Sequence, residues 1–189
     1  MKRDVQGFTL VELLIVAVVL AIFAAIVVPQ FASTTDEAKE SALKSDLAAI
    51  RSAIDLYRQQ HTAYPGVTTA VPAAPLTCSA TAGAGTGGGT GAQAATAFLS
   101  QLTLYTNANG MACSSNASGD FPFGPYLRDD AIPANAVNGD ATVTVINTGD
   151  LAMGADASAV LGWKFDSATG KFIVNDDGAD SKGVDFDTY

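Results

Sequence analysis

The N-terminal segment constrains this chain more than any other feature. Residues 8–28 form an apolar run whose single charge is Glu12, four places after Phe8. As a helix rising about 1.5 Å per residue, the run would be roughly 31 Å long, enough to cross the hydrocarbon core of a bilayer. A carboxylate in such a helix is costly in lipid and therefore calls for a partner. Cleavage after Gly7 would place a new amino group on Phe8, one helical turn from Glu12, on the same chain or a neighbour.

The first residues also carry a specific motif. Residues 1–7 form a short charged leader, and Gly-Phe-Thr-Leu-x-Glu follows at residues 7–12. This pattern resembles the N-terminus of the type IV pilin-like family, which comprises pilins and the pseudopilins of type II secretion. The resemblance implies processing at Gly7 and Phe8, with cleavage and amine methylation by a prepilin peptidase, and a role for Glu12 in assembly. The motif covers about the first thirty residues.

Two other readings of the N-terminus were weighed against this resemblance. An ordinary secretory signal peptide has a basic start, but its apolar core is usually about 7–15 residues long. A plain membrane anchor would explain the length, and the positive-inside rule would keep Lys2 and Arg3 in the cytoplasm. Neither alternative explains the Gly7–Phe8 pair together with Glu12.

Residues 29–62 keep a helical period but become amphipathic. A single apolar stripe recurs at spacings of four and three residues, formed by Leu43, Leu47, Ile50, Ile54 and Tyr57. Either Thr34 and Glu37 form a capping box that restarts a helix after Pro29, or both lie inside one continuous helix. His61 is expected at the helix end, facing solvent or interacting with the last carbonyls.

The remaining residues, 63–189, predict a globular domain. Residues 67–96 are a Gly/Ala/Thr-rich loop, and 95–107 are expected to form a short helix. Three strands are expected at 141–146, 161–165 and 171–174, the last two joined by a turn over 166–170. The core aromatic and aliphatic residues of these strands are Trp163, Phe165, Phe172 and Val174. The predicted fold is α+β: a long N-terminal helix packed on a small antiparallel sheet, as the pilin-like resemblance also implies.

Two cysteines occur, Cys78 and Cys113, in a region that would face an oxidising compartment. Only one pairing is possible, and a disulfide there would stabilise the domain by roughly 3–4 kcal/mol through loop entropy. The alternative is two free buried thiols.

The C-terminal tail holds the one candidate ligand site. Asp176, Asp177, Asp180 and Asp185 alternate with glycines and offer the oxygen ligands that calcium prefers. The resemblance supports this, since major pseudopilins often carry a C-terminal calcium loop. The spacing is not that of an EF-hand, and a solvated acidic tail remains the alternative. No other cofactor is expected.

The chain shows no catalytic or zinc-binding pattern, because a single histidine and two distant cysteines supply neither. We therefore expect a protein that is not an enzyme. The net charge of −9 also argues against nucleic acid as the main partner.

The favoured function is a structural subunit of a membrane-assembled helical filament, as a type II secretion pseudopilin. The helix end at Tyr64–Pro65 and the Gly-Pro-Tyr-Leu segment at 124–127 resemble the major pseudopilin. A type IV pilin for adhesion, motility or DNA uptake is the first alternative, and a membrane-anchored periplasmic binding domain the second. The implied partners are other pilin-like subunits, a prepilin peptidase and an inner-membrane assembly platform. The implied location is the bacterial inner membrane, single-pass, with the domain in the periplasm until assembly.

Overall fold

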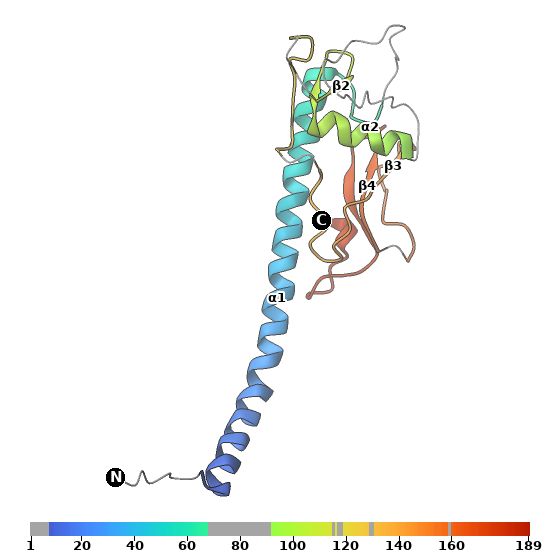
Figure 1. Ribbon diagram of the computed structural model, residues 1–189. Coiled ribbons are helices and arrows are strands. Elements are labelled where there is room, and N and C mark those ends of the chain that lie inside the picture. The colour runs from blue at the N-terminus through green and yellow to red at the C-terminus, as the bar shows by residue number, and fades with distance from the viewer. Residues whose placement is uncertain (1–7, 68–91, 115, 117–118, 129–130, 159) are drawn as a thin grey trace, which may run out of the picture.

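The computed structural model describes residues 8–67, 92–114, 116, 119–128, 131–158 and 160–189. One long helix, α1 (Leu10–His61), runs from the N-terminal end to a globular domain that packs against one side of its C-terminal half (Figure 1). The helix passes Pro29 and Thr34 without interruption, which confirms the continuous alternative over a restart at Thr34. α1 ends at Thr62, which adopts a left-handed conformation and donates its N–H to the carbonyl of Arg58.

The C-terminal half of α1 buries the predicted apolar stripe. Its five members are at most 2% exposed: Leu43, Leu47, Ile50, Ile54 and Tyr57. They pack in one core with the predicted residues of the sheet, Trp163, Phe165, Phe172 and Val174, which are also buried. The apolar side of the helix and the apolar face of the sheet therefore pack against each other in a single core.

A three-stranded sheet forms the other side of this core. Its order is β3 (Val143–Ile146), β4 (Val160–Asp166) and β5 (Phe172–Asp176). β4 and β5 pair antiparallel as predicted, around the turn that ends at Gly170. β3, however, pairs with β4 in parallel, Val143 opposite Trp163, so the sheet is mixed and not antiparallel throughout as expected.

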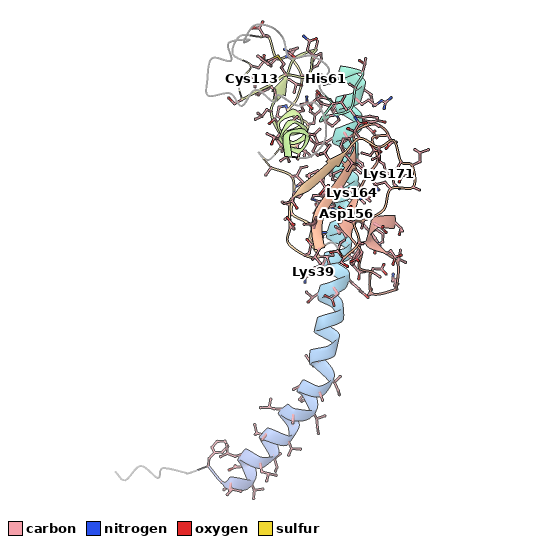
Figure 2. All side chains as sticks on the ribbon, turned by 90° about the vertical axis from the view of Figure 1, so that its right-hand side faces the viewer. Lys39, His61, Cys113, Asp156, Lys164 and Lys171 are labelled. Carbon is pink, nitrogen blue, oxygen red and sulfur yellow. The ribbon has the colours of Figure 1, made fainter. Side chains whose placement is uncertain are left out.

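The parallel pairing follows from the long connection between β3 and β4. Two parallel neighbours need a crossover of about a dozen residues, far more than a hairpin loop. The described part of this crossover, residues 147–158, is held by Lys164 of β4 and by Lys171, which directly precedes β5. Lys171 Nζ donates to the carbonyl of Met153 at 2.8 Å, and Lys164 Nζ donates to the carbonyl of Gly154 at 2.9 Å and to Asp156 at 2.6 Å. Figure 2 shows these lysines and Asp156 close together.

The remaining elements close the end of the domain around the C-terminus of α1. Helix α2 (Ala92–Thr103) buries Phe98 and Leu102, leaves Leu99 partly buried, and both begins and ends earlier than the expected 95–107. Directly after α2, β1 (Tyr105–Thr106) and β2 (Ala112–Cys113) form a small antiparallel hairpin. A short 3-10 helix, η1 (Phe186–Thr188), ends the chain beside β5.

Candidate functional site

The N-terminal half of α1 leaves its apolar surface uncovered. Large apolar side chains from Leu10 to Val27 are 39–79% exposed. Among the described residues, this is the one stretch long and apolar enough to cross a membrane. In Figure 1 it projects away from the globular domain, so no part of the described chain covers it. Such a surface requires lipid or the helices of other molecules.

The one charged side chain within this apolar stretch is turned back toward the start of α1. Glu12 Oε2 accepts from the main-chain N–H of Thr9 at 2.9 Å and from the Thr9 hydroxyl at 2.7 Å. The N–H of Glu12 in turn donates to Thr9 Oγ1 at 3.3 Å, which completes a capping box. The carboxylate is thereby held at the helix terminus nearest Phe8, where a positive charge would form after cleavage.

Sequence reasoning missed this capping box, although its signal was available. Thr9 and Glu12 have the Thr-x-x-Glu spacing at the beginning of an apolar helix. The same spacing was instead considered at Thr34 and Glu37, which the structure places inside α1. Glu12 therefore has a partner within its own chain, and its pairing with the Phe8 amine stays a prediction.

The processing site lies at the border of the described residues. Phe8 is 74% exposed and precedes the first helical residue, while Gly7 lies outside the described residues. Cys113 on β2 is fully buried and is not a free thiol, and its predicted partner Cys78 also lies outside the described residues. Cleavage after Gly7 and the Cys78–Cys113 pairing therefore stay predictions.

The only histidine is a buried structural residue. His61 lies at the last turn of α1 and stacks on the ring of Tyr57 at 4.1 Å between centroids. Its Nδ1 lies 3.0 Å from the carbonyl oxygen of Tyr57, and its Nε2 lies 2.9 Å from that of Asn107. The expected contact with the last helical carbonyls is confirmed, and the solvent-facing alternative is wrong because the domain closes over the helix end.

The first two tail aspartates bind loops rather than one another. Asp176 accepts from the N–H of Gly178 and from the amide of Asn138, each at 2.9 Å. Asp177 accepts from the N–H of Ser158 at 2.8 Å, in the crossover connection. Each carboxylate thus holds a different segment of the domain.

The other two predicted ligands lie in the last loop. Asp180 Oδ1 accepts from the N–H groups of Lys182 and Val184 at 2.8 and 2.9 Å, and Oδ2 accepts from the hydroxyl of Tyr189 at 2.6 Å. The Tyr189 hydrogen bond is the main reason that the pKa of Asp180 falls to about 2. Asp185 is exposed, and its side chain makes no capping hydrogen bond to η1.

The predicted calcium ligands therefore do not fit a single metal centre. Within the described ranges, no three Asp, Glu, His or Cys residues are grouped so that they could hold an ion. A hollow of about 370 Å³ beside the last loop is lined by Asp36, Glu40 and Asp180, but the ammonium-bearing Lys39 lines it as well. Asp176, Asp177 and Asp180 instead accept from separate main-chain and side-chain donors of the protein, which spacing along the chain cannot reveal.

Comparisons with known proteins bear on the N-terminal motif and on about a third of the chain. Residues 2–28 match the prokaryotic N-terminal methylation motif. Three relatives are each named type II secretion system core protein G. The protein of Pseudomonas aeruginosa is 47% identical over 64 residues, which are 34% of this chain and 45% of the relative. Those of Klebsiella michiganensis and Aeromonas hydrophila are 39% and 38% identical over 66 and 64 residues, again 34% of this chain, and 46% and 45% of the relatives.

The chain spans a little less than half the length of these relatives. No solved structure matches it significantly. The matches confirm the predicted resemblance to the pilin-like family, and within it to the core pseudopilin of type II secretion. The α+β architecture, with a long apolar helix followed by a small sheet domain, agrees with that resemblance.

Proposed function

We propose that this chain is a structural subunit of a membrane-assembled helical filament, of the kind that supports protein export by type II secretion. The main support is that the two halves of the continuous helix α1 have different surroundings. The C-terminal half contributes to the core of a domain, and the half up to Val27 exposes an apolar surface. The methylation motif over residues 2–28 begins that exposed half. The proposed role is structural and involves no catalysis.

The exposed half of α1 would be covered twice in succession, first by lipid and then by neighbouring subunits. Lipid is as apolar as a neighbouring helix, so the hydrophobic effect alone does not favour the second state. Close packing and polar pairs have to supply the preference. Repeated head-to-tail contacts that do not close into a ring then produce a filament.

Glu12 supplies the polar pair in this proposal. After cleavage, the Phe8 amine of an adjacent subunit would approach the carboxylate that Thr9 now holds at the helix start. The Thr9 contact keeps the carboxylate hydrogen-bonded while the subunit waits in the membrane, and the incoming amine adds a charged partner. This charged pair forms only in the assembled state, so it favours docking of the subunit over its return to the membrane.

The membrane arrangement follows from the same residues. Lys2 and Arg3 would keep the leader in the cytoplasm, where a prepilin peptidase acts, and the sheet domain would lie in the periplasm. Other pilin-like subunits and an inner-membrane assembly platform complete the set of partners.

The filament role is tested by Glu12→Ala, with Glu37→Ala as a matched control on the exposed surface of the same helix. We expect Glu12→Ala to insert in the inner membrane as wild type does, or better, and to lower the filament yield in sheared fractions at least tenfold. Glu37→Ala should assemble normally. A normal yield from Glu12→Ala would contradict the docking role.

Type II secretion is preferred over a pilus because the three relatives compared above all carry that name. Deleting the gene in its host should abolish release of an extracellular enzyme and leave twitching and surface attachment unchanged. The opposite pattern would support the type IV pilin alternative.

A further inference from the structure

The last loop of the chain, residues 178–189, lies against α1 and is here called the C-terminal latch. Polar and charged side chains of α1 contact main-chain groups and an aromatic ring of the latch. We propose that the carboxylates of the latch contact are satisfied by hydrogen-bond donors of the protein, with the Tyr189 hydroxyl at Asp180 in place of a divalent cation. This inference does not depend on the proposed filament role.

Asp180 organises the interior of the latch. Three donors converge on its carboxylate, namely the N–H groups of Lys182 and Val184 and the Tyr189 hydroxyl. A main-chain hydrogen bond from Asp180 N to the carbonyl of Val184, at 2.8 Å, closes the same turn. The carboxylate charge is thus compensated by three hydrogen-bond donors that all belong to the latch itself.

Glu40 connects the latch to the long helix. Only 9% of this residue is exposed, and a carboxylate so placed on α1 requires hydrogen-bond donors. The latch provides two: Ser181 N donates to Oε1 at 2.8 Å, and Ser181 Oγ donates to Oε2 at 3.2 Å. The carboxylate of Glu40, like that of Asp180, therefore accepts hydrogen bonds from the protein itself.

Tyr189 joins the two parts. Its hydroxyl binds Asp180, while Lys44 Nζ lies 4.0 Å from the centre of its ring. Its main-chain oxygen accepts from Arg51 Nη2 at 2.7 Å, and its ring packs edge-on against Phe186. Lys44 and Arg51, two cations of α1, thus both contact Tyr189, the residue whose hydroxyl donates to Asp180.

These contacts would oppose a calcium ion in the latch. An ion coordinated by Asp180 would have to displace the Tyr189 hydroxyl or the two N–H donors, and it would lie near Lys44. Calcium needs about six to eight oxygen ligands, whereas the latch turns N–H groups toward its central carboxylate. The groups that surround the Asp180 carboxylate are hydrogen-bond donors, as expected for a latch closed by hydrogen bonds.

Opening of the latch can be followed at Lys182, which is exposed. Full-length protein in detergent would be treated with the lysine-specific endoproteinase Lys-C, and release of residues 183–189 timed by mass spectrometry. We expect equal release rates in calcium, in magnesium and in chelator. Tyr189→Phe, which keeps the ring but removes the donor, should speed release on the order of tenfold. The fluorescence of buried Trp163 reports whether the core of each variant is intact.

Asp185→Asn is the matched control, because it removes one latch carboxylate that makes no capping hydrogen bond. In a hydrogen-bonded latch it should leave the release rate unchanged. Calcium-dependent protection that Asp185→Asn or Asp180→Asn abolishes would overturn the proposal and establish a metal site. A Tyr189→Phe variant with an intact core and the wild-type release rate would also overturn it.

Discussion

The guanidinium group of Arg51 binds the carbonyl oxygen of Phe172 with two donors, Nε at 3.0 Å and Nη2 at 2.8 Å. Arg51 lies on α1, and Phe172 is the first residue of β5. Among the described residues, β5 lies at the edge of the sheet, so no described strand pairs with its outer carbonyls. A side chain of the long helix therefore satisfies the edge of the sheet that it covers.

Replacing this arginine should loosen the helix from the sheet. Arg51→Leu leaves the Phe172 carbonyl without its donor, and we expect a loss of about 1.5–3 kcal/mol in the free energy of unfolding. Arg51→Lys keeps the charge but cannot present a planar pair of donors, so its loss should be smaller but measurable. Urea unfolding followed by Trp163 fluorescence measures both. Equal stability of all three proteins would show that the Arg51 contact is energetically neutral.

Gly170 illustrates a close approach between the helix end and a strand turn. Its φ is +80°, and a Cβ at this position would overlap the ring of Tyr64. That ring cannot move freely, because it lies between the Arg58 guanidinium and Phe165. Gly139 has nearly the same φ, +78°, with nothing within 4 Å of a Cβ.

The two glycines form a matched pair for mutation. Gly139→Ala should cost only the left-handed backbone strain of about 1–2 kcal/mol. Gly170→Ala should cost a further ~1–3 kcal/mol, because Tyr64 has to be displaced. Thermal unfolding of both variants measures the difference. If the two variants melt together, the Tyr64 contact contributes nothing beyond the backbone term.

The ion pair in the crossover connection predicts a pH dependence. Lys164, and then Asn175, hold the pKa of the Asp156 carboxyl below its usual value. A lowered folded-state pKa means that the stabilisation is complete above the unfolded pKa of about 3.9 and is lost as the pH falls through the folded value. Asp156→Asn should therefore cost up to about 1 kcal/mol at pH 6, with the difference shrinking between pH 4 and pH 2. Urea unfolding at those pH values tests this.

Asp46 on α1 provides a control of opposite sign. Partial burial raises its pKa, so ionisation of this carboxyl opposes folding. Asp46→Asn should not destabilise the protein at pH 6, and wild type should gain stability relative to this variant as the pH falls. If both variants follow the trend predicted for one of them, the pKa assignment of the other is contradicted.

Processing at Gly7–Phe8 predicts a defined mass. The mature membrane protein should lack residues 1–7 and carry one added methyl group. Gly7→Ala should still be cleaved, whereas a bulky residue at position 7 should leave the leader in place. Intact-mass spectrometry distinguishes these states, and a mature N-terminus after Ala32 would instead support an ordinary signal peptide.

Features encoded by local pattern were predictable from the residues alone. The spacing of Leu43, Leu47, Ile50, Ile54 and Tyr57 predicted the buried side of α1, because helical periodicity is a property of neighbouring residues. The turn from Asp166 to Gly170 likewise predicted the β4–β5 hairpin. The N-terminal motif predicted the family resemblance, since it is read residue by residue.

Only the tertiary structure decided how segments far apart in the chain pair and contact one another. β3 joins β4 in parallel because the crossover is long enough to return along the sheet, and no local pattern in β3 specifies its direction. The acidic tail was ambiguous for a related reason: a carboxylate can coordinate a metal ion or accept a hydrogen bond from an N–H group. Which one it meets depends on the fold, which here places the Tyr189 hydroxyl beside Asp180 and the N–H of Ser158 beside Asp177. Local sequence thus determined the elements and the N-terminal motif, while the partners of polar groups depended on contacts between residues far apart in the chain.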